Sequence, residues 1–109
     1  MTTPNELFAE LPASVDPDAV KSLNATIQFN LTGEDGGRWW AVIRDGRVEV
    51  GEGAVQNANV TIAMDAHDYV DMAVGTLNHQ VAFMSGRLQI SGDMELAMRL
   101  RTLFRRPVA

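Results

Sequence analysis

The spacing of the apolar residues changes after Met64, and that change limits the folds that the chain can adopt. In residues 25–31 every second residue is apolar, which predicts a strand with one buried face and with Gln28 and Asn30 facing water. After Met64 the apolar residues recur every three or four positions, as they do on one face of a helix. A sheet and separate helices must therefore share one core.

Turn sequences divide the first part of the chain into short strands. The pair Asp45-Gly46 favours a two-residue hairpin between two such segments. Residues 38–44 are apolar on both faces, so the adjacent Trp39 and Trp40 point to opposite faces of a strand. We expect one indole in the core and the other on the outer face, either exposed or covered by a partner. The predicted strands are residues 25–31, 38–44, 47–50, 59–64 and 87–91.

Aspartates precede most of the segments with helical spacing. Asp16, Asp65 and Asp93 are each expected at a helix start, where a side-chain oxygen can accept backbone N–H groups. Gly75 is expected to end the helix that follows Asp65. Strands with one polar face and segregated helices predict a two-layer α+β domain. The predicted helices are residues 5–11, 16–23, 66–74 and 78–84, and a last helix that follows Gly92 and reaches Phe104.

Composition indicates an ordinary globular protein and excludes several functions. The chain has 109 residues, of which 46% are hydrophobic and 21% charged, so we expect one domain, residues 1–109. The net charge of −5 argues against a nucleic-acid partner, and the lack of cysteine excludes disulfides and thiolate catalysis. No apolar run approaches membrane-spanning length, and residues 1–8 lack the features of a signal peptide. We therefore expect a cytoplasmic protein.

One cluster could suggest acid–base chemistry or a metal: Asp65, His67 and Asp68. Their spacing puts the three side chains on different faces of a helix start, where the two carboxylates already have a role as caps and dipole partners. No serine lies in a nucleophile elbow, and no glycine run fits a phosphate loop. We therefore expect no enzymatic activity, no metal site and no cofactor.

Residues 81–100, VAFMSGRLQISGDMELAMRL, closely resemble the signature of the sterol carrier protein type 2 family. That signature has an aromatic-rich short helix, a Gly-Lys/Arg-Leu-x-Ile strand, Gly-Asn/Asp-Met and a Leu-Ala-Met-Lys/Arg-Leu helix. Residues 58–65 resemble the strand upstream of it. The resemblance implies a five-stranded, mostly antiparallel sheet covered on one face by helices, with an apolar tunnel between the layers. The core would be residues 24–104, preceded by a helical part at residues 1–23.

The same resemblance implies a function. We expect non-catalytic, intracellular binding and transfer of a fatty acid, fatty acyl-CoA or sterol-like ligand. The alternative is an accessory or oligomerisation domain that presents a lipid substrate to a partner enzyme. The chain lacks a peroxisomal Ser/Ala-Lys-Leu ending and resembles a stand-alone, bacterial, cytoplasmic member of the family. The residues expected to contact lipid, or alternatively to fill a packed core, are Val70, Met72, Phe83, Met84, Met94, Met98, Leu100, Leu103 and Phe104.

Arginines concentrate near the carboxyl end of this acidic chain, at Arg99, Arg101, Arg105 and Arg106. Basic side chains stabilise the negative end of a helix, which explains the cluster without any ligand. The alternative is contact with an anionic headgroup, a CoA phosphate or, transiently, a membrane surface.

Overall fold

The computed structural model of the chain describes residues 3–14, 21 and 23–103, and the side chains of all of these except 11–14 and 100–103. The helix predicted at residues 16–23 falls mostly outside the described residues. The other predicted elements are present, with ends that coincide or differ by up to three residues. They are α1 (Pro4–Ser14), β1 (Ala25–Thr32), β2 (Gly37–Arg44), β3 (Arg47–Glu52), β4 (Val60–Asp65), α3 (Ala66–Val74), α4 (His79–Met84), β5 (Gln89–Gly92) and α5 (Met94–Leu103).

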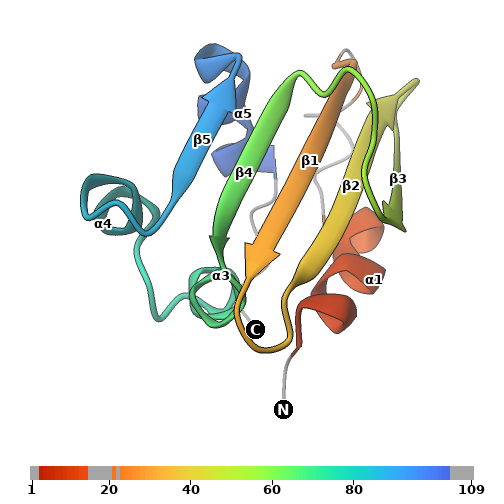
Figure 1. Cartoon of the computed structure of the whole chain (residues 1–109). Helices are drawn as coiled ribbons and strands as arrows, with labels where there is room; N and C mark the ends of the chain where they lie inside the picture. The colour runs from red at the N-terminus through yellow and green to blue at the C-terminus, as the bar shows by residue number, and fades with distance from the viewer. Residues whose placement is uncertain (1–2, 15–20, 22, 104–109) are drawn as a thin grey trace.

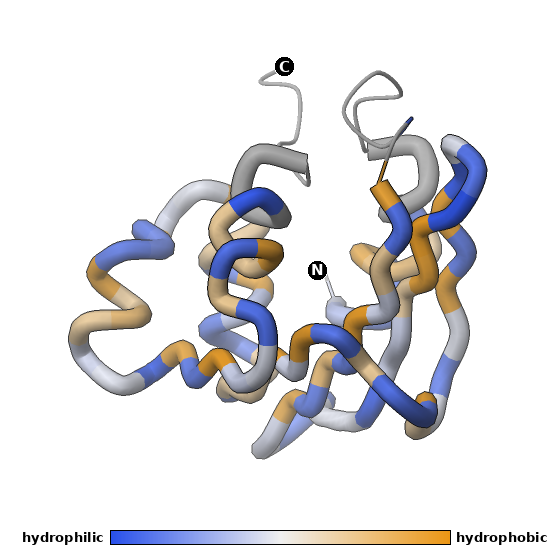
Figure 2. The backbone as a smooth tube through the Cα atoms, turned by 90° about the horizontal axis from the view of Figure 1, so that it is seen from above, coloured by the Kyte–Doolittle hydropathy of each residue, from blue (hydrophilic) through white to orange (hydrophobic). Residues whose placement is uncertain are grey.

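The five strands form one sheet in the order β3-β2-β1-β4-β5. All neighbouring strands are antiparallel except β1 and β4, which run parallel with Ile27 opposite Val60. In Figure 1, α1, α3 and α5 lie behind the sheet, α4 lies beside the β5 edge, and the β3–β4 connection crosses the front face. Figure 2 shows the molecule from above, with hydrophobic and hydrophilic residues alternating along much of the chain. The predicted α+β fold, with a mostly antiparallel sheet covered on one face, is confirmed.

Phe8 of α1 lies in the middle of the layer between the sheet and the helices. Its ring stacks on Trp39 of β2 at 4.9 Å and on Tyr69 of α3 at 5.2 Å, and meets Phe29 of β1 edge-on at 4.9 Å between centroids. These rings, together with Ile27 and the other inward residues of the central strands, form the buried core. The aromatic cluster therefore joins α1 and α3 to β1 and β2.

The prediction that Gln28 faces water is wrong. The side chain lies on the outer face of β1, as the alternation of side chains along a strand requires. The loop after β3 covers it, and only 6% of the residue is exposed. Its amide group donates hydrogen bonds to the backbone oxygens of Trp39 at 3.0 Å and Gly53 at 3.1 Å. Its Oε1 accepts the backbone N–H of Val55 at 2.7 Å. Gln28 thus fastens the loop to the outer face of the sheet.

The two tryptophans lie on opposite faces of β2, as predicted. Trp39 is buried in the core, and Trp40 is half-buried on the outer face. The Trp40 indole lies over Gly51 of β3, so closely that a Cβ atom at position 51 would overlap the ring. The absence of a side chain at Gly51 therefore leaves the space that the Trp40 indole occupies.

Asp65 caps α3, as the sequence predicts. Its Oδ1 accepts the backbone N–H of His67 at 2.8 Å and that of Asp68 at 3.4 Å, and Gly75 ends the helix in the left-handed conformation at φ 90°. Two of the N–H groups that a helix start leaves without intrahelical partners are satisfied in this way.

Replacing Asp65 by alanine should lower the free energy of unfolding by about 1 kcal/mol, because the two N–H groups lose their acceptor. Thermal or urea unfolding monitored by circular dichroism measures this loss. The matched control is Asp71→Ala, an exposed position on the same helix, which should change stability by less than about 0.5 kcal/mol. Equal losses in the two variants would contradict the capping role.

Candidate functional site

The exposed large apolar side chains of the described residues all come from one stretch of the chain, residues 74–98. Met84 is 77% exposed and Met98 is 67% exposed, although methionine is usually buried. Several large exposed apolar side chains from one stretch of the chain indicate a site of interaction. The complete set is Val74, Val81, Phe83, Met84, Met94 and Met98.

Helix α4 exposes its large residues because it is short and buries only one position. Asn78 begins the helix by accepting the N–H groups of Gln80 at 2.8 Å and Val81 at 3.2 Å. Ala82 is the buried residue, and its backbone oxygen accepts the N–H of Leu88 at 3.0 Å. A helix held by an alanine approaches the rest of the fold closely and leaves Phe83 on its exposed surface.

Helix α5 divides its apolar residues between two faces. Asp93 accepts the N–H of Leu96 at 3.0 Å, and its own N–H donates to the backbone oxygen of Asn59 at 2.9 Å, which ties the helix start to the start of β4. Leu96 is buried in the core. Met94 and Met98, four residues apart, share an exposed face. Within the described part of the chain, no segment packs against the face that carries Met94 and Met98 closely enough to bury it.

The predicted lipid-contacting residues therefore fall into three groups. Val70 and Met72 on α3 are half-buried and pack against the core. Phe83 and Met84 are exposed on α4, which lies beside the β5 edge of the sheet, and Met94 and Met98 are exposed on α5, which lies behind the sheet. The side chains of Leu100 and Leu103, and all of Phe104, lie outside the described residues. Val74 and Val81 belong to the same exposed set but were not predicted, although helical spacing on α4 could have suggested Val81.

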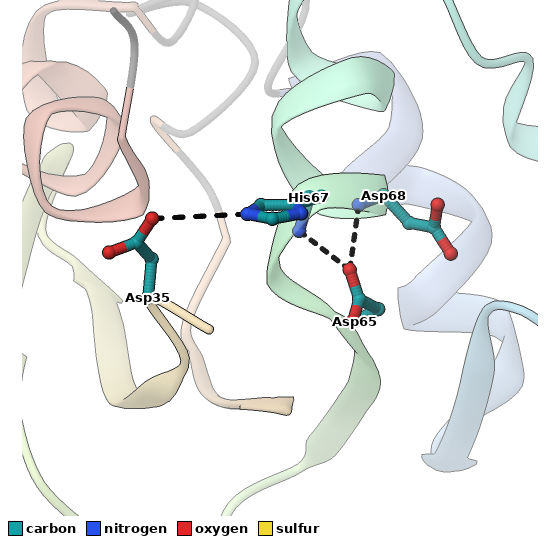
Figure 3. Close-up of polar contacts among 4 residues, drawn as sticks. All are labelled: Asp35, Asp65, His67 and Asp68. Atoms are coloured by element: carbon teal, nitrogen blue, oxygen red, sulfur yellow. Dashed lines mark hydrogen bonds and ion pairs between the residues drawn. The ribbon is translucent and has the colours of Figure 1, made fainter. Parts of the chain in front are cut away.

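The cluster around His67 connects a turn to a helix start (Figure 3). His67 Nε2 lies 3.8 Å from Asp35 Oδ2, and both side chains are more than half exposed. Asp35 comes from the β1–β2 turn, where it adopts φ 64°, and no sequence pattern predicted this contact. Among residues 3–14, 21 and 23–103, no group of three or more His, Cys, Asp or Glu side chains is placed to hold a metal ion. The geometry favours a structural contact.

A cavity of about 310 Å³ lies at the other end of the sheet, on the β2–β3 hairpin. Four of its five lining residues are charged, and only Val42 is apolar, so its chemistry does not suit an acyl chain. Its charged residues are Arg44, Asp45, Arg47 and Glu49.

Comparison with known families gives a match over residues 5–105, to the model described as the SCP-2 sterol transfer family. The chain belongs to the SCP-2 sterol transfer family. This match confirms the resemblance seen in residues 81–100 and extends it across almost the whole chain. Within the described residues, no helix of this SCP-2 domain is long and apolar enough to cross a bilayer.

Several relatives of this SCP-2 domain are much longer proteins. Hydroxysteroid dehydrogenase-like protein 2 from Xenopus laevis is 38% identical over 99 residues, and the Homo sapiens protein of that name is 41% identical over 100 residues. Each match covers 90% of this chain and 24% of the relative. The chain thus spans about a quarter of the length of these curated relatives.

Solved structures confirm the SCP-2 fold. Palmitated SCP2L2 from Aedes aegypti aligns with a TM-score of 0.80 at 20% identity, over 98% of this chain and 100% of that one. The sec-alkylsulfatase Pisa1 from Pseudomonas sp. aligns with a TM-score of 0.80 at 21% identity, over 99% of this chain and 17% of that one. The same fold therefore occurs both as a whole chain and as a small part of a larger protein.

Proposed function

We propose that this SCP-2 domain binds a lipid without catalysing a reaction and carries it between locations in the cell. The observation that carries this proposal is the exposed apolar set on α4 and α5, in a chain that belongs to a sterol transfer family. The Aedes aegypti neighbour, solved in palmitated form, supports an acyl chain as the ligand. A fatty acid, a fatty acyl-CoA and a sterol-like molecule are the candidate ligands.

Removal of the acyl chain from water would supply most of the binding free energy. Each buried methylene contributes about 0.8 kcal/mol, so a long chain can bind with little polar recognition. Methionine side chains are flexible and polarisable, which suits ligands of varied shape. We propose that the lipid lies between the sheet and the helices. The proposed contacts are Val70, Met72, Phe83, Met84, Met94, Met98, Leu100, Leu103 and Phe104.

A displacement assay tests this function. A fluorescent fatty-acid analogue should bind at about one site per chain and be displaced by unlabelled long-chain fatty acids, acyl-CoA or sterol. Met98→Gln should weaken binding about tenfold, since an apolar contact worth more than 1 kcal/mol is lost. The same variant should keep its free energy of unfolding within about 0.5 kcal/mol, because Met98 is exposed in the lipid-free fold.

The matched control is Glu95→Gln, an exposed position on the same helix. It should change neither binding nor stability. Absence of displaceable binding by fatty acids, acyl-CoA and sterols alike would overturn the carrier function. If Met98→Gln unfolds more easily but binds normally, then Met98 does not contact the lipid.

A second candidate function is supported by the relatives. In hydroxysteroid dehydrogenase-like protein 2 the matching region is 24% of the protein, and in the sec-alkylsulfatase it is 17%. An accessory role, in which the domain presents lipid to a partner enzyme, would explain why the matching region is a small part of these longer proteins. Native mass spectrometry of freshly purified protein separates the two. A co-purified lipid supports the carrier, whereas a stoichiometric protein partner supports the accessory role.

The charge distribution supports transient contact with an anionic membrane surface. Residues 75–109 contain five arginines and two carboxylates, a net charge of +3, and the rest of the chain has four basic residues and twelve carboxylates, a net charge of −8. The exposed apolar set of α4 and α5 lies in this basic third. Apolar side chains beside arginines suit the interface of an anionic bilayer, where such a carrier would exchange its lipid.

A further inference from the structure

Two buried polar side-chain atoms of the described residues have no hydrogen-bond partner: Asn30 Oδ1 and Trp39 Nε1. Trp39 faces the layer between the sheet and the helices, where the lipid is proposed to lie. Only 8% of the residue is exposed. Most buried N–H groups in proteins are paired, and a buried one without an acceptor costs about 1–3 kcal/mol. The indole N–H of Trp39 therefore needs an explanation.

The aromatic neighbours do not supply an acceptor. Phe8 stacks on the indole with an angle of 13° between the two ring planes. An indole N–H lies in the plane of its own ring, so it points past a parallel ring and cannot meet the π-face of Phe8. The unpaired N–H thus belongs to an indole that faces the apolar layer, and the stacked Phe8 ring does not satisfy it.

The surroundings of Trp39 decide which acceptor would suit it. Every described Lys and Arg side chain is exposed, so none lies in the layer to balance a negative charge. An ionised carboxylate moved next to Trp39 would be buried without a counter-ion, which is costly. A neutral carbonyl oxygen accepts one N–H without that penalty. An ester, thioester or ketone therefore fits better than a free carboxylate.

We propose that the indole N–H of Trp39 donates a hydrogen bond to a neutral carbonyl oxygen of the bound lipid. This inference rests on the lipid-binding function proposed above and adds a polar anchor to it. The hydrocarbon part of the lipid extends from β2 across β1 and β4 toward β5 and the exposed residues of α4 and α5. Three strand spacings separate β2 from β5, about 14 Å, which a long acyl chain spans. Because the nitrogen is closed to solvent, the rings around it must part to admit the carbonyl group.

Nuclear magnetic resonance of ¹⁵N-labelled protein tests the anchor directly. The two indole N–H signals belong to Trp39 and Trp40, and Trp40→Phe assigns them. Trp40, on the outer face, serves as the internal control. Methyl palmitate should move the Trp39 indole proton downfield and leave that of Trp40 in place. Hexadecane, which has no oxygen, should bind without that downfield shift.

Affinity gives a second readout. Methyl palmitate should bind about fivefold more tightly than hexadecane, the ratio that one net hydrogen bond provides. Trp39→Phe keeps an aromatic ring but lacks the donor, so it should abolish this preference. If that variant does not fold, the chemical shifts of the wild-type protein still decide.

The outcomes separate this inference from the carrier function. If methyl palmitate displaces the fluorescent analogue but leaves the Trp39 signal unchanged, the anchor is overturned and the carrier function stands. The same conclusion follows if hexadecane produces an equal downfield shift, or if ionised palmitate produces the larger shift and binds more tightly. If none of these lipids binds, both proposals fail.

Discussion

Replacing Phe8 by alanine is expected to lower the free energy of unfolding by about 3–5 kcal/mol, the usual cost of emptying a buried phenylalanine site. Phe8 is 2% exposed and contacts three other aromatic rings, which come from β1, β2 and α3. Small domains are stable by only about 5–15 kcal/mol, so the variant should unfold at a much lower denaturant concentration. Urea or guanidinium unfolding measures the loss.

The matched control is Phe83→Ala, which removes the same ring from an exposed site on α4. Phe83 is 47% exposed, so the loss of stability should be below about 1 kcal/mol, while lipid binding should weaken. The two phenylalanines thus test stability and binding separately. Equal destabilisation by the two substitutions would show that α4 is packed far more tightly than its exposure indicates.

Replacing Gln28 by leucine should cost about 3 kcal/mol. The substitution leaves the backbone oxygens of Trp39 and Gly53 and the N–H of Val55 without their side-chain partner. Each buried group that loses its partner costs about 1–3 kcal/mol, and the loop groups recover part of this cost from water. Chemical unfolding gives the total, and amide hydrogen exchange at Val55 should become faster because the loop is no longer fastened.

Gln89→Leu is the control, because Gln89 is an exposed glutamine on the edge strand β5. Its effect should stay within about 0.5 kcal/mol. A Gln28→Leu variant as stable as the wild type, with unchanged exchange at Val55, would mean that backbone contacts alone hold the loop.

Local patterns predicted the elements of the fold well, because each depends on neighbouring residues. The alternation of apolar and polar residues predicted strands, the Asp45-Gly46 pair predicted the hairpin, and Asp65 predicted the start of α3. Gln28 shows what such patterns omit. Its position in the alternation of side chains along β1 correctly placed it on the outer face. Whether that face is covered depends on a loop some 25 residues away, which no local sequence pattern indicates.

The candidate site was less predictable for the same reason. The sequence marked Phe83, Met94 and Met98 as lipid contacts or core residues, but did not show that Ala82 and Leu96 are buried while these three are exposed. That division depends on the short length of α4 and on the attachment of Asp93 to β4. The unpaired N–H of Trp39 depends on the orientation of the indole, which strand parity does not determine.

The two edge strands of the sheet, β3 and β5, affect how readily the domain aggregates with other chains. An outer strand offers unpaired backbone groups to which a foreign strand can add, and this is a common route to aggregation. Here β5 offers only four residues, Gln89–Gly92, and β3 carries exposed charges at Arg47, Glu49 and Glu52. Strand addition is disfavoured at both ends. A domain of this kind can therefore sit within a crowded, multidomain protein without extending its sheet into a neighbour.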